Sequence, residues 1–158
     1  MSFSASMSPA AGARSRLSDR DALFRDLGEA VEPGSARSVL VVIGFEGLRE
    51  YLESVADGLR DELLDRLGEC LLAAGNGTTV YRSRRGEFCL LFEGGLEAIR
   101  STLVVLPCEL DEIGRPCGVR ASLGIAILPD EATVPTYALA LADRRIRALS
   151  GEVRGQIR

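Results

Sequence analysis

The sequence contains no histidine and no lysine, so all 19 of its basic residues are arginine. Histidine is the commonest general base in enzymes, and its absence argues against hydrolase or acyl-transfer chemistry. The formal net charge is −4, which gives no global electrostatic support for binding DNA or RNA. The exclusive use of arginine agrees either with codon bias or with bidentate recognition of a phosphate group.

Cysteine is scarce and scattered, and no two cysteines form a CxxC pair. Without histidine, the usual mixed zinc sites cannot be assembled, so we expect no metal site. Apolar neighbours flank most of the cysteines, and this predicts buried thiols in a reducing compartment, hence a cytoplasmic protein. The four residues are Cys70, Cys89, Cys108 and Cys117.

Long apolar runs are also missing. Stretches such as residues 39–43 are far too short to cross a bilayer, so we expect no association with a membrane. Residues 1–16 are rich in Ser, Ala and Gly and contain no apolar core of signal-peptide length. We interpret them as a disordered leader and residues 17–158 as one domain.

Helical and extended patterns alternate along residues 17–158. A capping signal at Ser18-x-x-Asp21 opens a helix that ends at Pro33-Gly34. The remaining predicted elements are a strand over 38–45, two helices within 48–74 separated near residues 57–58, strands over 78–82 and 87–92, a helix over 96–106 ended by Pro107, a strand over 118–128 and a helix over 137–149. This order predicts an α/β (α+β) fold with a central mixed sheet of about five strands and helices on both faces.

The polar tripeptide Arg84-Arg85-Gly86 separates two of the predicted strands and is typical of a tight hairpin tip. With the next two residues it reads Arg-Arg-Gly-Glu-Phe, which resembles the Gly-Gly-Asp/Glu-Glu-Phe signature of the GGDEF (diguanylate cyclase) family with its last two positions kept. Residues 120–126 (RASLGIA) resemble the family's (V/I)TASIGVA strand, and Ala142-Asp143-Arg144 with Arg154 is similar to its closing ADxALYxAKxxGRN helix.

The resemblance spans residues 17–158 and implies a fold related to nucleotidyl cyclases and polymerase palms. In that fold the hairpin would lie beside the end of the first central strand, where the family binds GTP and a divalent metal. The family's DxDxFKxxND string falls on residues 44–53, so its first metal aspartate becomes Gly44. Its second metal carboxylate becomes Gly86, and its guanine-binding asparagine becomes Leu52. The resemblance therefore implies a degenerate domain without catalytic activity or a need for Mg²⁺.

Other positions of the family site are kept or have become basic. Asp61 stands at the position of an aspartate that contacts guanine, and Glu87 is kept within the signature. The basic positions are Arg49 in place of a lysine, Arg154 at a family arginine, and the new Arg84 and Arg85. Guanidinium groups in place of carboxylates favour a phosphodiester over a metal ion. We therefore predict that these six residues bind cyclic di-GMP.

The family's separate inhibitory RxxD motif is missing, because Gly75 and Thr78 occupy its two charged positions. Three alternatives to nucleotide binding at the altered site stay open. The charges could simply be solvated, with Asp61 pairing with the adjacent Arg60. The domain could be a nucleotide-free module that docks on a signalling protein or forms a homodimer. Residual cyclase activity would have to use Glu46 and Glu87 as substitute metal ligands.

Overall fold

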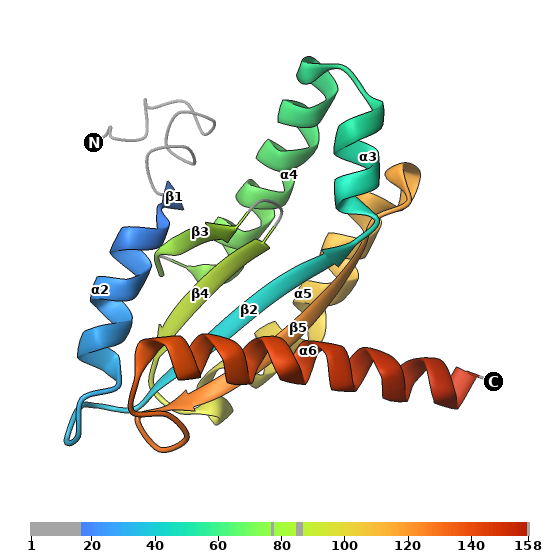
Figure 1. Cartoon of the computed structure of the whole chain (residues 1–158). Helices are drawn as coiled ribbons and strands as arrows, with labels where there is room; N and C mark the ends of the chain where they lie inside the picture. Colours follow the sequence, from blue (N-terminus) through green and yellow to red (C-terminus); the bar gives the residue numbers. More distant parts are fainter. Residues whose placement is uncertain (1–16, 77, 85–86, 158) are drawn as a thin grey trace.

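The computed structural model describes residues 17–76, 78–84 and 87–157, and the leader expected over residues 1–16 lies outside them. Helices and strands alternate along the described chain (Figure 1). The elements are β1 (Leu17–Ser18), α2 (Arg20–Ala30), β2 (Ser38–Glu46), α3 (Leu48–Ser54), α4 (Asp57–Gly75), β3 (Val80–Arg84), β4 (Glu87–Glu93), α5 (Leu96–Gly114), the short 3₁₀ helix η2 (Arg115–Cys117), β5 (Arg120–Leu128) and α6 (Pro135–Ile157). Within the described ranges, no helix combines the length and the apolar character that spanning a bilayer requires.

Five strands form one sheet in the order β1-β3-β4-β2-β5. The short β1 runs parallel to β3, whereas all other neighbouring strands are antiparallel. This arrangement confirms the mixed sheet expected from the sequence. Residues 38–43 of the central strand β2 are all buried, as an apolar run without alternation predicts for a strand covered on both faces.

Helices cover both faces of the sheet (Figure 1). α4 and α5 pack on the face that carries Val39, Val41 and Ile43. α2 and α6 pack on the opposite face, which carries Leu40 and Val42. Burial of each such side chain stabilises the fold by about 1.5–3 kcal/mol relative to an exposed one, so the two apolar layers hold the sheet between the helices.

The helix α2 begins one residue later than the capping signal suggested. Asp19 is the N-cap, and its carboxylate accepts a hydrogen bond from the backbone N–H of Ala22 at 2.9 Å. Ser18 is unavailable for this role because it belongs to β1, where it pairs with Tyr81. A long-range strand pairing therefore displaced the cap by one position.

The helix α5 continues past Pro107 to Gly114, so the expected stop at Pro107 is wrong. A proline inside a helix removes one backbone hydrogen bond and costs about 3 kcal/mol. Leu106 and Leu110, on either side of it, are at most 1% exposed, and their burial offsets that cost. The extension also places Asp111 where its carboxylate accepts the backbone N–H of Ala121 in β5 at 2.7 Å.

The cysteines differ in exposure more than the sequence suggested. Cys89 is buried, Cys70 and Cys117 are half-buried, and Cys108 is exposed on α5. Burial, with a smaller contribution from Glu109, raises the pKa of the Cys70 thiol to about 11, so this group stays protonated at neutral pH. The expectation of a buried thiol is wrong for Cys108 because its apolar neighbours Val104 and Val105 lie on the same outward face of the helix.

Glu131 and Arg145 tie the β5–α6 connection to α6. Arg145 Nη1 and Nη2 donate to the two carboxylate oxygens of Glu131 at 2.8 and 2.9 Å, and Nη1 also donates to the carbonyl of Ile125 at 2.9 Å. The backbone N–H of Ile127 donates to the same carboxylate at 2.8 Å. The hydrogen bonds from Arg145 are the main reason that the pKa of Glu131 lies below its ordinary value.

We expect Glu131→Gln to lower the free energy of unfolding by about 1–2 kcal/mol at neutral pH, because it removes charge-assisted hydrogen bonds. The folded-state pKa of Glu131 lies below the unfolded one, so its contribution exists above the unfolded pKa and disappears as pH falls through the folded pKa. Urea unfolding should therefore show a gap between wild type and variant that closes from about pH 7 to about pH 3. A gap that is unchanged in acid would contradict the ion pair.

Asp130→Asn is the matched control for this measurement. The neighbouring Asp130 pairs with Arg37 at 3.2 Å, but both side chains are more than half exposed. Exposed pairs contribute little to stability, so this substitution should change it by less than about 0.5 kcal/mol at either pH.

Candidate functional site

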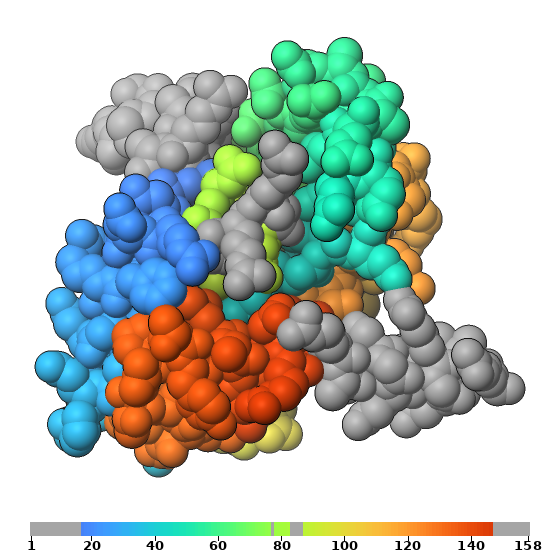
Figure 2. Space-filling view, viewed as in Figure 1, coloured from blue at the N-terminus to red at the C-terminus, as the bar shows by residue number. Residues whose placement is uncertain are grey.

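The C-terminal end of β2 lies between the β3–β4 hairpin and β5. Ile43 pairs with Phe88, so Gly44 comes beside the start of β4. On the other side, Gly44 pairs with Ser122 and Glu46 pairs with Arg120. We call this end of the sheet, formed by Gly44, Glu46, Glu87, Arg120 and Ser122, the hairpin edge. In the space-filling view, α2, α3 and α6 surround this end of the sheet (Figure 2).

The hairpin has a shorter tip than the sequence suggested. β3 continues to Arg84, which pairs with Glu87, and the register is irregular between Arg82 and Arg84. An additional residue in one strand of an antiparallel pair produces such a bulge. Arg84 is therefore a strand residue, and its side chain, like the whole of Arg85 and Gly86, lies outside the described part of the chain.

Gly44 faces the helix α6. Side chains alternate between the two faces of a strand, and Leu40 and Val42 already face α2 and α6. A Cβ atom added to Gly44 would lie 3.7 Å from Cδ1 of Ile146, which is an ordinary contact distance. The direction in which a longer side chain at position 44 would extend is therefore bordered by an apolar group of α6.

This environment does not fit a divalent cation at position 44. Magnesium is bound by oxygen ligands, usually carboxylates. Gly44 supplies no side-chain oxygen, and Ile146 beside it is apolar. The nearest acidic residue of β2, Glu46, stands opposite Arg120 across the strand pair. The described residues around position 44 therefore form a contact between the sheet and α6, and they do not provide the oxygen ligands of a metal centre.

Arg49 and Asp61 occupy the two helices that follow β2. Arg49 is exposed in the first turn of α3, two residues after Gly47 and therefore close to the hairpin edge in the chain. Asp61 is exposed on α4. The pairing with Arg60 that was left open as an alternative is not the one observed, because Arg60 Nη1 lies 3.2 Å from a carboxylate oxygen of Asp57. Arg154 belongs to the last part of α6, and its side chain lies outside the described part.

Leu52 has become a core residue. It is 9% exposed and packs in the apolar layer that covers Val39, Val41 and Ile43. A buried leucine presents no hydrogen-bonding group, so the side chain at position 52 has nothing with which to recognise a guanine edge. Of the two guanine-contacting positions that the resemblance implied, only the exposed Asp61 keeps a polar side chain.

Sequence reasoning missed two arginines near the hairpin edge. Arg82 places its guanidinium 5.6 Å from the ring centroid of Phe88, which in turn makes an edge-on contact with Phe45 at 6.1 Å between centroids. Arg120 stands opposite Glu46 on β5. Both arginines are exposed. Both arginines lie near the site because of the register between strands, and the residues next to them in the sequence do not predict that register.

The described basic residues here are therefore Arg49, Arg82 and Arg120, which come from α3, β3 and β5. The acidic residues are Glu46 and Glu87, and each stands across a strand pair from an arginine position. Guanidinium groups can form charge-assisted hydrogen bonds to phosphate oxygens and can stack on planar rings. Arg82 lies over Phe88 in the layer that α4 and α5 cover, whereas Arg120 lies on the same side of the sheet as Gly44, so these two arginines border the hairpin edge from opposite faces.

No protein-family model matches the chain, and no curated protein matches it in sequence. Solved structures do resemble its fold. The coiled coil and GGDEF domain of DgcB from Caulobacter crescentus, in complex with c-di-GMP, matches with a TM-score of 0.69 and 18% identity, over 86% of this chain and 78% of that one. The GGDEF domain of FimX from Pseudomonas aeruginosa matches with a TM-score of 0.69 and 20% identity, over 90% and 92%.

A third structure contains a protein partner. It is diguanylate cyclase SiaD in complex with its activator SiaC from Pseudomonas aeruginosa, and it matches with a TM-score of 0.67 and 16% identity, over 85% of this chain and 55% of that one. At sequence identities of 16–20%, the similarity to these structures shows the fold of the chain and nothing more. The chain has the fold of GGDEF domains, as the hairpin string and its neighbours predicted.

Proposed function

We propose that this chain is a GGDEF-like signalling domain that binds cyclic di-GMP at the hairpin edge without synthesising it. One observation carries the proposal. The strand register sets a glycine, Gly44, beside the hairpin where a metal-binding carboxylate would be needed, and it places Arg120 opposite Glu46, two residues further along β2. The site has therefore exchanged groups that attract cations for groups that attract phosphates.

Loss of catalysis follows from the chemistry of cyclisation. A divalent ion is needed to neutralise the triphosphate and to activate the attacking ribose hydroxyl. Position 44 supplies no ligand, and a side chain introduced there would meet Ile146. Glu46 and Glu87 stand opposite arginine positions, which makes them poor substitutes as metal ligands. We therefore expect no cyclase activity from this domain.

Binding of the dinucleotide is supported by energetic and structural arguments. A hydrogen bond to a charged group contributes roughly 1.5–3 kcal/mol, and a micromolar dissociation constant corresponds to about 8.2 kcal/mol. Two or three such bonds, with a guanine ring stacked on a guanidinium such as that of Arg82, contribute roughly 3.5–11 kcal/mol, a range that includes this value before the cost of association is subtracted. The similar domain of DgcB was crystallised in complex with the same dinucleotide.

Binding is expected to be independent of Mg²⁺, because the guanidinium groups contact the phosphodiesters directly. Calorimetric titration with cyclic di-GMP should give dissociation constants that agree within about twofold with and without the ion. Raising the salt concentration should weaken binding, since exposed charges are screened. Heat that appears only when Mg²⁺ is present would contradict an arginine-based site.

An interaction module is the second candidate, and the surface of α5 favours it. Val104 and Val105 are 67% and 50% exposed, although they are large apolar residues. Exposed apolar groups of this kind are typical of protein contact surfaces when they cluster. If cyclic di-GMP gives no heat under any condition, docking on a protein becomes the favoured function.

A further inference from the structure

The strand β5 stands at one end of the sheet, so one of its sides has no neighbouring strand among the described residues. α5 and α6 cover its two faces (Figure 1). In an antiparallel strand, every second residue turns both its N–H and its carbonyl away from the neighbouring strand. Ala121 and Ile127 do so, because their N–H groups bind carboxylates outside the ladder. Leu123 and Ile125 lie between them in an unbroken register and share this outward direction.

Neighbouring side chains cover only the two ends of this outward side. At the start of β5, Asp111 of α5 accepts the N–H of Ala121 at 2.7 Å. Towards the other end, Arg145 of α6 donates to the carbonyl of Ile125 at 2.9 Å. Glu131 bonds both backbone groups of the next outward residue at 2.8 Å each. Such side-chain cover is a common protection of an exposed strand against pairing.

The middle of the outward side lacks this cover. Within the described ranges, no hydrogen bond reaches the carbonyl of Ala121, the N–H or carbonyl of Leu123, or the N–H of Ile125. These groups follow one another along the strand. Residues 121–128 also contain no charged residue and no proline, the residues that usually keep an exposed strand from pairing. This stretch can therefore accept another strand.

We propose that two copies of this chain pair through β5, antiparallel to each other, about a two-fold axis at Leu123. Residues that face each other in such a pair exchange both of their hydrogen bonds. Leu123 therefore bonds twice to Leu123 of the partner subunit. On either side of the axis, the N–H of Ile125 in one copy donates to the carbonyl of Ala121 of the partner subunit. Every uncovered group thus finds a partner, as a symmetric, self-complementary contact requires.

The covered groups are complementary in the same register. The N–H of Ala121 lies opposite the carbonyl of Ile125 of the partner subunit, and both groups already have side-chain partners. The direct ladder therefore stops at this point. The carboxylate of Asp111 comes beside the guanidinium of Arg145 of the partner subunit, once on each side of the axis. This meeting of opposite charges favours the proposed register over one that is shifted along the strand.

Apolar surface lies beside the uncovered stretch. Val104 comes two helical turns before Asp111 and therefore lies on the side of α5 that faces the edge of β5. Because only the short η2 connects α5 to β5, the helix runs back along the strand, and two turns cover about three strand residues. Val104 thus lies near the level of Leu123, with its side chain 67% exposed. In the proposed dimer the two α5 helices lie on the same face of the joined sheet and cover this side chain.

Sedimentation velocity of the full chain, from about 1 µM to about 1 mM, tests for this dimer. We expect a concentration-dependent change from one chain to two, with a dissociation constant on the order of 0.1 mM for so small an interface. Val104→Glu brings like charges together near the axis and should raise that constant by about tenfold or more. The exposed position should let this variant fold. No nucleotide is added, so the result does not depend on binding of cyclic di-GMP.

Val105→Glu is the matched control, because it makes the same change at the adjacent residue. Val105 is 50% exposed and lies one turn before Glu109, whose charge raises the pKa of Cys70 in α4. It therefore lies on the side of α5 that is turned away from β5. This variant should dimerise like wild type. An equal loss in both variants would overturn the proposal, and so would a wild-type chain that stays monomeric at about 1 mM.

Hydrogen exchange identifies the strand that pairs. The amides of Leu123 and Ile125 should exchange about tenfold or more slowly at about 1 mM than at about 0.01 mM, because ladder bonds protect them only in the dimer. The amides of Ala121 and Ile127 are bonded within one chain, so their exchange should not change with concentration. A dimer in which Leu123 and Ile125 keep their exchange rates would contradict pairing through β5.

Discussion

Gly124→Ala is expected to destabilise the fold by about 3 kcal/mol or more. Gly124 lies in β5, and a Cβ atom at this position would come within 1.9 Å of the carbonyl oxygen of Ala142 in α6 and 2.7 Å of Cγ1 of Ile146. The first of these atoms belongs to the helix backbone and cannot move away by rotating a side chain. The whole of α6 would have to shift from the sheet, which would open the apolar layer beneath it.

Gly28→Ala provides the control for this prediction. Gly28 lies inside α2, and a Cβ atom there would have nothing within 4 Å. Alanine in a helix is favoured over glycine by roughly 0.5–1 kcal/mol, so this variant should be slightly more stable than wild type. Urea unfolding monitored by circular dichroism compares the three proteins. An unchanged midpoint for Gly124→Ala would mean that α6 does not pack directly on β5.

The close contact between Gly124 and α6 also affects the candidate site. Ile146, which borders Gly44, belongs to the helix turn that presses on Gly124. Close packing of α6 therefore keeps an apolar group over the position where a metal ligand would be required. An aspartate at position 44 would have its Cβ atom in ordinary contact with Ile146, so an apolar group would lie beside its carboxylate.

Arg84→Ala/Arg85→Ala is expected to weaken binding of cyclic di-GMP by about 100-fold or more. Each lost hydrogen bond to a phosphate contributes at least roughly 1.5 kcal/mol, and a factor of ten corresponds to about 1.4 kcal/mol. The substitutions remove the two arginines that stand at the positions of the two glycines in the GGDEF signature that the hairpin resembles. Calorimetry or fluorescence titration of wild type and variant measures the change.

Arg66→Ala/Arg100→Ala controls for the loss of two positive charges. Both residues are exposed on α4 and α5, and Arg100 pairs with Glu97 at 2.9 Å. This variant should bind the dinucleotide within about threefold of wild type, since salt screens exposed charges that do not contact the ligand. An equal loss in both variants would point to a general charge effect and would contradict a site at the hairpin.

The sequence alone predicted the fold class, most element types and the hairpin. An unbroken apolar run predicts the buried strand over residues 38–45. The helical spacing of apolar residues over 48–74, interrupted near residues 57–58, predicts the two helices that follow it. These signals are local, because hydrophobic period and turn chemistry act over a few residues. These signals were less reliable at the ends of elements. Burial of Leu106 and Leu110 stabilises α5 beyond Pro107, where the sequence predicted its end. Strand pairing of Ser18 in β1 makes Asp19 the N-cap of α2 in its place.

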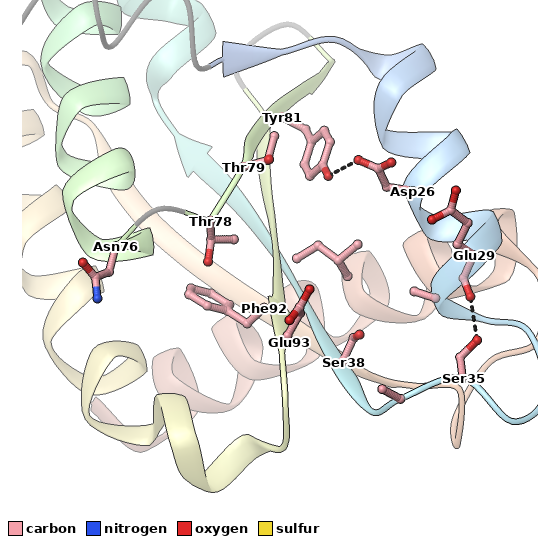
Figure 3. Close-up of a pocket in the computed structure, with 13 residues that line it drawn as sticks. Asp26, Glu29, Ser35, Ser38, Asn76, Thr78, Thr79, Tyr81, Phe92 and Glu93 are labelled. Carbon is pink, nitrogen blue, oxygen red and sulfur yellow. Dashed lines mark hydrogen bonds between the residues drawn. The ribbon is translucent and has the colours of Figure 1, made fainter. Parts of the chain in front are cut away.

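For the candidate site, too, the sequence predicted some features and the tertiary structure decided the others. Sequence and family resemblance together indicated the missing carboxylates at Gly44 and Gly86 and the gain of arginines. Only the tertiary structure brought Arg82 over Phe88, set Arg120 opposite Glu46, buried Leu52 and placed Ile146 beside Gly44. It also brought residues of α2, β2, β3 and β4 together around one groove, although they are far apart in the chain (Figure 3). Strand register and helix docking decide which side chains meet, and these depend on packing between distant segments that no short stretch of sequence encodes.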